Sequence, residues 1–165
     1  MDGTVEEISN IKNARIIIHK RKGKKKSLVD SINEGINISN NENIIWMDAD
    51  YSHPPNYIEK FIKLKNEKNI DVIVCSRFLA KSKRYYENQD KKKAGIDFLS
   101  NFLNFICKKF LFSDFTDYTS GYICIKSSLI KNIKLKGYYG DYFITLITKC
   151  KILGFSILEI PFVEK

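Results

Sequence analysis

Two aspartates, one residue apart, are the residues whose types and spacing most clearly suggest chemistry. Asp48 and Asp50 directly follow the apolar stretch 43–47, and alternate residues of a strand face the same side. Carboxylate oxygens are preferred ligands of Mg²⁺ and Mn²⁺, which usually keep water and phosphate oxygens as further ligands. A metal held there would neutralise the charge that grows on a departing nucleoside diphosphate. The structural alternative is that one aspartate caps the next helix and the other lies in a turn.

Three other polar residues stand at the ends of predicted elements. Arg77 follows the predicted strand 70–75, and its planar guanidinium suits the binding of phosphate oxygens in pairs; the alternative is a surface arginine. Asp141 begins a predicted helix after Gly140, a position that suits an N-cap. We interpret His53 as a structural hydrogen-bonding residue rather than a catalyst.

Short apolar strands that alternate with helices must position these residues. The sequence predicts strands over 15–19, 43–47, 70–75 and 155–162, and a loop followed by a strand over 114–125. It predicts helices over 27–39, after Pro54 and Pro55, over 96–112 and over 141–153, with a polar loop over 79–95. This order predicts an α/β fold, with a mostly parallel sheet and helices on both faces. No strand precedes the first helical stretch, so we expect a single catalytic domain over residues 1–165 that lacks the first strand.

Composition and charge narrow the classes of protein. The chain has 165 residues, of which 44% are hydrophobic, enough for one domain with its own core. A net charge of +9 favours an anionic partner, such as a phosphorylated molecule, a nucleic acid or an acidic membrane surface. The four cysteines form no CxxC pair, which predicts free thiols in a reducing cytoplasm and no zinc site. We expect neither a signal peptide nor a run of the roughly 20 apolar residues that span a bilayer.

Several segments resemble, in order, the motifs of family 2 glycosyltransferases, especially the dolichol-phosphate (polyprenyl-phosphate) mannosyltransferase type. The most specific is MDADYSHPP at 47–55, which resembles the metal-binding segment of that family. The others are RKGK at 21–24 with SINEGI at 31–36, DVIVCSRF at 71–78, LSNFLN at 99–104, DYTSGY at 117–122, and GF through EIP at 154–161. The resemblance spans nearly the whole chain, and it implies a GT-A-like (Rossmann-like) fold.

The resemblance also implies a reaction and roles for individual residues. A sugar would pass, with inversion, from a nucleotide-sugar such as GDP-mannose or a UDP-sugar to a polyprenyl or dolichyl phosphate. Asp48 and Asp50 would bind Mg²⁺ or Mn²⁺ and the donor diphosphate. Arg77 and Lys24 would contact the donor phosphates, although a solvated face is the better interpretation for most lysines of the run 20–26.

Some positions depart from the family pattern. Ser52 stands where relatives often have glutamine as a further metal ligand, so it is a weaker candidate ligand. Ile123 replaces the arginine that commonly follows S-G-F, and Asp117 suits a turn as well as a site. The expected basic element beyond Lys165 and the first nucleotide-binding strand are both absent, so we expect a chain shortened at both ends.

The acceptor decides whether a general base is needed. A lipid phosphate is already largely ionised near neutral pH, whereas a sugar hydroxyl would need a base, and Asp141 lies where many relatives place an acid. A transferase acting on a glycan or another hydroxyl is therefore an alternative, as is an inactive fragment. A nucleic-acid binder rests on charge alone, because most aromatic residues occupy core-like positions; we predict no nucleic-acid partner.

The predicted helix 96–112 is a candidate membrane-binding element. Its apolar stripe comprises Leu99, Phe102, Leu103, Ile106 and Phe110, widened by Phe98, Phe105 and Phe112 and flanked by Lys108 and Lys109. A broad apolar face with adjacent cations can lie in the headgroup layer and receive a lipid acceptor, while the alternative is an ordinary buried helix. These features predict a cytoplasmic enzyme that is peripheral at the cytoplasmic face of a membrane.

Overall fold

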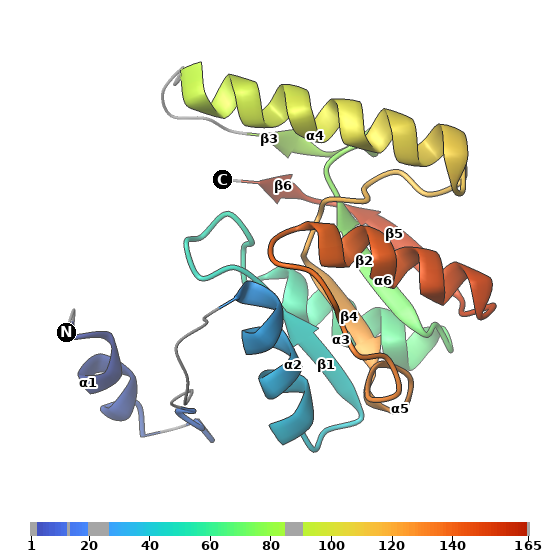
Figure 1. Cartoon of the computed structure of the whole chain (residues 1–165). Helices are drawn as coiled ribbons and strands as arrows, with labels where there is room; N and C mark the ends of the chain where they lie inside the picture. Colours follow the sequence, from blue (N-terminus) through green and yellow to red (C-terminus); the bar gives the residue numbers. More distant parts are fainter. Residues whose placement is uncertain (1–2, 13, 20–26, 85–90, 165) are drawn as a thin grey trace.

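An open four-stranded sheet forms the centre of the structure, a computed structural model that describes residues 3–12, 14–19, 27–84 and 91–164 (Figure 1). In spatial order the strands are β1 (Asn43–Trp46), β4 (Ile123–Lys126), β2 (Val72–Ser76) and β5 (Ile157–Pro161). A second sheet pairs the short strands β3 (Lys83–Arg84) and β6 (Val163–Glu164) in parallel. The mixed α/β architecture is that expected of a GT-A-like domain.

The prediction of a mostly parallel sheet is only partly right. β2 and β5 are parallel, but β4 lies between β1 and β2 and is antiparallel to both. The cause is the long helix α4 (Lys91–Phe110), which lies beyond the carboxyl ends of the strands instead of crossing back over a face of the sheet (Figure 1). The chain therefore re-enters the sheet from the same end at which β2 left it. For this reason β4 runs in the direction opposite to β2.

Helices cover both faces of the sheet, as the sequence predicts. The remaining helices are α1 (Thr4–Ser9), α2 (Leu28–Ile38), α3 (Tyr57–Glu67), α5 (Ser127–Ile130) and α6 (Asp141–Ile152). One core cluster joins α2 and α6 to the sheet face formed by Val72, Val74 and Ile123, and the other joins α3 to the face formed by Ile73 and Cys124. Alternate strand residues thus enter opposite cores, because successive side chains of a strand point to opposite faces.

Helix α2 begins and packs for reasons that are visible in the sequence. Ser27 is its N-cap, and the Ser27 hydroxyl accepts a hydrogen bond from the Asp30 amide at 3.0 Å. Val29 and Ile36 are buried on the side facing the sheet. On α3 the inward face is narrower than predicted: Phe61 is fully buried and Ile58 is half-buried, but Ile62 is 53% exposed.

The predicted strand at 15–19 is wrong. Residues 15–19 adopt no regular secondary structure, and Ile17 is 61% exposed. A strand needs a hydrogen-bonded neighbour, but a groove of about 440 Å³ lies between Arg15 and Ile17 on one side and Ile44 of β1 on the other. No strand in the described part of the chain pairs with the apolar run 16–18.

Candidate active site

The carboxyl end of β1 leads into a tight turn that carries both candidate metal ligands. The Asp48 amide donates a hydrogen bond to Nδ1 of His53 at 2.9 Å. The amide and hydroxyl of Ser52 both donate to Oδ1 of Asp50, at 3.0 and 2.6 Å. Between them, Tyr51 has a φ of 66°, a left-handed conformation that is uncommon for a residue other than glycine. The turn is therefore held by its own polar groups, with Asp48 and Asp50 exposed.

His53 connects this turn to the rest of the site. Its ring is 3% exposed and stacks on Tyr122, with ring centroids 4.7 Å apart and an interplanar angle of 12°. Burial lowers the pKa of His53 below its ordinary value, while Asp48 raises it, Arg77 lowers it and Asp50 raises it. Ile123 of β4 pairs with both Trp46 of β1 and Val74 of β2, so the strand ends that lead to Asp48 and Arg77 lie at the same end of the sheet. The interpretation of His53 as a structural hydrogen-bonding residue agrees with these contacts.

The charge and exposure of the two carboxylates suit a hard divalent cation. Hydrogen bonds from Ser52 hold the pKa of Asp50 below its ordinary value, so this carboxylate is ionised at neutral pH. The Asp48 side chain is 62% exposed, with Oδ2 lying 3.9 Å from Nδ1 of His53. Within the described ranges there is no group of three His, Cys, Asp or Glu residues that could hold a metal. Two carboxylates fit an ion that takes its remaining ligands from water and substrate phosphate.

Arg77 lies at the carboxyl end of β2, as predicted, but it is already engaged. Its Nε and a terminal nitrogen donate to the two carboxylate oxygens of Asp117, each at 2.8 Å. The same terminal nitrogen donates to the Thr119 hydroxyl at 2.7 Å. Because Asp117 is fully buried and the Arg77 side chain is only 13% exposed, much of the guanidinium serves to hold the 117–121 turn.

A buried polar network anchors that turn from two further elements. Glu159 of β5 accepts hydrogen bonds from the amides of Thr116 and Asp117 at 2.8 and 3.0 Å. Asn104 of α4 accepts from the Tyr118 amide at 2.6 Å and donates to the Thr119 hydroxyl at 3.0 Å. Burial raises the pKa of Glu159 despite these donors. The turn is thus fixed between β2, β5 and α4.

Asp141 begins α6 at the same end of the sheet. Gly140, and not Asp141, is the N-cap residue; the Asp141 carboxylate instead accepts hydrogen bonds from the amides of Tyr138 and Tyr139, at 3.2 and 2.9 Å. Gly137 precedes this turn with a φ of +131°, and a Cβ there would clash with the Asp141 carboxylate. Asp141 therefore fixes the loop before the helix, whatever else it does.

The next residue, Tyr142, ties the start of α6 to the end of β1. Its hydroxyl accepts a hydrogen bond from the Trp46 indole at 3.1 Å. Burial raises the pKa of Tyr142 to about 12, and Asp48 contributes to the rise. Gly121, with a φ of +72°, brings the 117–121 turn close, since a Cβ there would lie 3.8 Å from the Tyr142 hydroxyl and 3.9 Å from His53. The ends of β1, the turn and α6 therefore meet around His53 and Tyr142.

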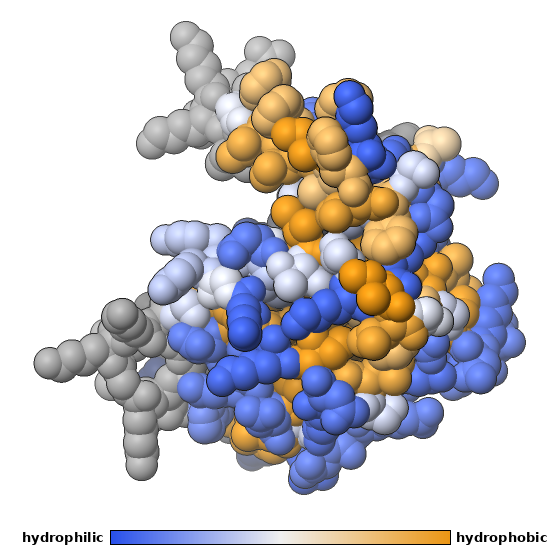
Figure 2. Space-filling model, turned by 45° about the vertical axis from the view of Figure 1, so that its right-hand side comes forward, coloured by the Kyte–Doolittle hydropathy of each residue, from blue (hydrophilic) through white to orange (hydrophobic). Residues whose placement is uncertain are grey.

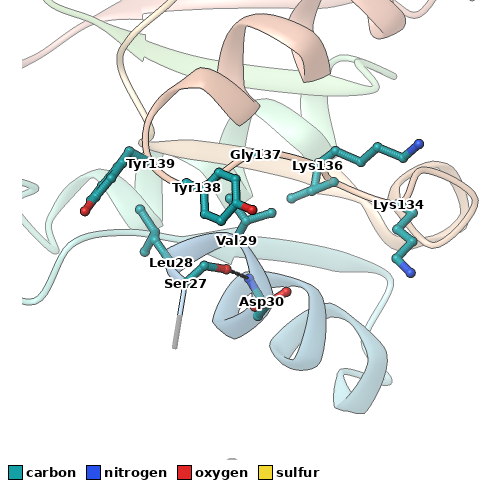
Figure 3. Close-up of a pocket in the computed structure, with 10 residues that line it drawn as sticks. Ser27, Leu28, Val29, Asp30, Lys134, Lys136, Gly137, Tyr138 and Tyr139 are labelled. Carbon is teal, nitrogen blue, oxygen red and sulfur yellow. Dashed lines mark hydrogen bonds between the residues drawn. The ribbon is translucent and has the colours of Figure 1, made fainter. Parts of the chain in front are cut away.

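A groove of about 630 Å³ opens beside Asp141, between the start of α2 and the loop before α6 (Figure 3). Its lining combines two lysines, two exposed tyrosines and the first turn of α2: Lys134, Lys136, Tyr138, Tyr139, Ser27, Leu28 and Asp30. Asp48, Asp50 and Arg77 are not among its lining residues. The groove therefore adjoins the candidate site through Asp141 rather than containing the two metal-binding candidates.

The sequence of this chain matches a known protein family. A family model described as "Glycosyl transferase family 2" matches residues 1–134. The chain belongs to this family. Membership in family 2 supports a glycosyltransferase, as the resemblance of the motifs indicates. The match covers Asp48, Asp50, Arg77 and Asp117 but ends before the groove loop and Asp141.

Among the curated proteins to which this chain is similar is an uncharacterized protein of Methanocaldococcus jannaschii. The two sequences are 26% identical over an alignment of 161 residues, and the match covers 88% of this family 2 chain. The chain spans 66% of the relative's length, just under two thirds. This similarity supports common descent.

The sequence alone predicts some residues of this family 2 site and not others. It predicts Asp48 and Asp50 at the end of one strand, with Ser52 as a weaker candidate ligand, and Arg77 at the end of another strand; in the structure β1 ends at Trp46, and both aspartates lie in the turn that follows. It does not predict the pairing of Arg77 with Asp117, although both residues lie in segments that resemble family motifs. It also does not predict the hydrogen bonds that Glu159 accepts. Tyr142 was also missed, and no local pattern marks its contact with Trp46. Lys24, a predicted donor contact, lies outside the described residues.

Proposed function

We propose that this family 2 protein transfers a sugar, with inversion, from a nucleotide-sugar donor to a polyprenyl phosphate. The observation that carries the proposal is the exposed Asp48–Asp50 turn at the carboxyl end of β1, at the same end of the sheet as Arg77, which follows β2. In open α/β sheets, ligands bind at the carboxyl ends of the strands. Anionic ligands for a metal and a cation for phosphate thus lie together where a donor diphosphate would bind.

In this proposal Asp48 and Asp50 hold Mg²⁺ or Mn²⁺ against the donor diphosphate. The bound ion would neutralise charge on the departing nucleoside diphosphate. Ser52 is proposed as a supporting residue rather than a direct ligand, because its hydroxyl already donates to Asp50 at 2.6 Å. Arg77 is proposed to bind the phosphates from the carboxyl end of β2, while its pairing with Asp117 fixes its position.

The proposed acceptor explains why a dedicated base is not evident. A lipid monophosphate is substantially ionised near pH 7, since its second pKa is about 6. Positioning and charge compensation would then supply most of the catalysis. A polyprenyl chain is embedded in a bilayer, so the proposal also places the enzyme at the cytoplasmic surface of a membrane.

The first test is a thermal-shift titration of the full chain with GDP-mannose, UDP-glucose and UDP-GlcNAc, with and without Mn²⁺. One donor at 100 times its Kd should raise the melting temperature by roughly 5 °C, only when Mn²⁺ is present. Asp50→Asn should abolish this rise. Asp114→Asn is a matched control, because Asp114 is an exposed aspartate that pairs with Lys151 away from the turn. Loss of the rise in both variants, or in neither, would count against the assignment of Asp50.

A related transferase with a hydroxyl acceptor is the second candidate. The groove beside Asp141 favours it, because Tyr138 and Tyr139 are 72% and 79% exposed and could stack on sugar rings. The two candidates share the donor site and differ in the acceptor. Radiolabelled sugar transfer to polyprenyl phosphate, compared with transfer to soluble glycosides, separates them.

A further inference from the structure

Helix α4 is oriented against the usual rule for a surface helix, with its polar residues turned inward. Ser100, Asn104 and Cys107 are buried against the 117–121 turn and the core, at spacings of four and three residues. The outward face is aromatic: Phe98 is 73% exposed, Phe102 is 52% exposed and Phe105 is 64% exposed. A soluble helix normally buries its apolar stripe and exposes its polar one.

The exposed side chains form one continuous patch rather than scattered apolar residues. Phe98, Phe102 and Phe105 follow spacings of four and three, and the rings of Phe98 and Phe102 stack with centroids 6.4 Å apart. Leu99 and Phe110, also exposed, extend the patch along the helix. Figure 2 shows apolar surface gathered over α4 at the top of the molecule, with hydrophilic surface beside it. Contiguous exposed apolar surface of this kind indicates a partner.

The charges of α4 indicate what kind of partner this is. Its first turn contains Lys91, Lys92 and Lys93, its last turn contains Lys108 and Lys109, and Asp97 is its one acidic residue. Lys109 follows Phe105 by four residues, so it continues the aromatic stripe. An aromatic face with lysines at both ends matches a surface that is apolar beneath and anionic at its headgroups.

A second copy of the chain fits this face less well. Two such helices packed face to face would bring lysines close to lysines whether they ran parallel or antiparallel, because both ends are basic. Insertion across the bilayer is also a poor fit: in the part of the chain that the structure describes, no helix has the length and apolar content to cross a membrane. What the face suits is a position in the plane of an anionic bilayer surface.

We propose that α4 is an interfacial helix that docks this protein on anionic lipid through Phe98, Phe102 and Phe105, with Lys108 and Lys109 at the headgroups. The inference extends the proposed function, which requires a membrane-embedded acceptor, but it rests on a surface distinct from the Asp48–Asp50 turn.

Docking through α4 also sets where the candidate site lies relative to the bilayer. The buried face of the helix contacts the turn that holds Arg77, since Ser100 and Asn104 both hydrogen-bond the Thr119 hydroxyl, at 2.8 and 3.0 Å. The Thr119 hydroxyl in turn accepts from Arg77 at 2.7 Å. One turn of backbone thus separates the proposed lipid-facing helix from the cation proposed to bind phosphate.

Vesicle flotation of the full chain tests the proposal without donor or metal, so its outcome is independent of transferase activity. We expect the protein to float with phosphatidylcholine–phosphatidylglycerol vesicles and far less with pure phosphatidylcholine. Phe98→Ser with Phe102→Ser should weaken partitioning by tenfold or more, because it removes two large apolar side chains from the proposed lipid-facing surface. Lys108→Gln with Lys109→Gln should weaken it by about tenfold or more, and only at low salt.

A matched control removes exposed apolar surface elsewhere. Ile152 and Leu153, at the end of α6, are 71% and 58% exposed, so Ile152→Ser with Leu153→Ser should leave flotation unchanged. Circular dichroism melts should be alike for all variants, because every substituted side chain is exposed. Equal flotation of the phenylalanine variant and the wild type would overturn the proposal. So would a wild-type dimer in sedimentation equilibrium that the phenylalanine substitutions dissociate, without any vesicle binding.

Discussion

Arg77 and Asp117 form a two-pronged ion pair between residues 40 positions apart in the sequence, each prong 2.8 Å long. The Arg77 amide adds a third hydrogen bond to the same carboxylate at 2.9 Å. Because the Asp117 side chain is fully buried and that of Arg77 is 13% exposed, water can do little to replace the carboxylate. The pair therefore matters first for the integrity of the site.

Asp117→Ala should lower the free energy of unfolding by about 3–5 kcal/mol, since it leaves a largely buried guanidinium without this counter-charge. Asp114→Ala should cost less than about 1 kcal/mol, because the Asp114 side chain is 70% exposed and its ion pair with Lys151 is screened. Urea denaturation followed by circular dichroism measures both. A similar small loss in the two variants would contradict the structural role of Asp117.

Ser52→Ala should raise the pKa of Asp50 toward its ordinary value. The Ser52 hydroxyl is the largest contributor to the lowered pKa, and the Ser52 amide, which remains in the variant, is the second. The expected result is a partial upward shift in the carboxyl titration of Asp50, measured by NMR. Asn56→Ala, a change of an exposed polar side chain just beyond the turn, serves as a control and should leave the titration unmoved.

The pH dependence of stability should report the burial of His53. Its pKa in the folded state lies below the ordinary value of 6.5, so the unfolded chain takes up a proton first as the pH falls. The stabilisation is therefore complete above pH 6.5 and is lost progressively below it. Protonation of Nδ1 would also break the hydrogen bond from the Asp48 amide.

Melting temperatures between pH 7.5 and 5 measure this effect. The slope should flatten in His53→Gln and persist in His19→Gln, the matched change at the other of the two histidines. Glu159, whose pKa is raised by burial, titrates with the opposite sign, but it is present in every variant and cancels in the comparison. An unchanged slope in His53→Gln would show that other groups set the acid limit.

Asp141→Asn separates a base from a structural residue. The asparagine keeps an oxygen that can accept the hydrogen bonds from the Tyr138 and Tyr139 amides. With a polyprenyl phosphate acceptor, kcat should fall less than about tenfold and its pH profile should stay the same, whereas loss of a general base costs about 10²–10⁴-fold. Steady-state kinetics across pH decide between these outcomes, and a large loss would favour the hydroxyl acceptor.

Gly137→Ala should destabilise the protein by about 1–3 kcal/mol, because a φ of +131° strains any residue with a Cβ. The added methyl would also meet the Asp141 carboxylate and displace the loop beside the groove. Gly35→Ala is the contrasting control: it lies within α2 with nothing within 4 Å of its Cβ position, so alanine should stabilise by about 0.5–1 kcal/mol. Thermal denaturation of both variants provides the comparison.

Much of the fold could be predicted from local patterns. The helical spacing of Val29, Ile32 and Ile36 and the apolar strands at 43–47 and 70–75 correctly predicted helices and strands. The direction of β4 could not be predicted in this way. It depends on whether α4 crosses a face of the sheet or remains beyond the carboxyl ends of the strands. Periodicity gives the faces of a helix but not what those faces contact.

The candidate site was predictable to a similar degree. Asp48 and Asp50 could be found from their spacing after an apolar strand, and Ser52 from the family pattern. The partnership of Arg77 with Asp117 and the role of Glu159 depend on contacts between strands far apart in the chain, for which the sequence has no local signal. On α4 the apolar stripe was recognised, yet only the structure decides that Ser100 and Asn104 face inward.

The contacts of Glu159 and β5 indicate when the candidate site forms during folding. β5 completes the sheet by pairing with β2, whose residues were synthesised 85 positions earlier, and Glu159 then receives the amides of Thr116 and Asp117. Contacts between such distant segments form late, because a long loop must close before they gain any stabilisation. On the ribosome β1, β2 and β4 emerge before β5, so the polar network around Asp117 forms only after Glu159 has been synthesised. A nascent chain therefore contains Asp48, Asp50 and Arg77 before it contains the carboxylate that fixes the turn of Asp117.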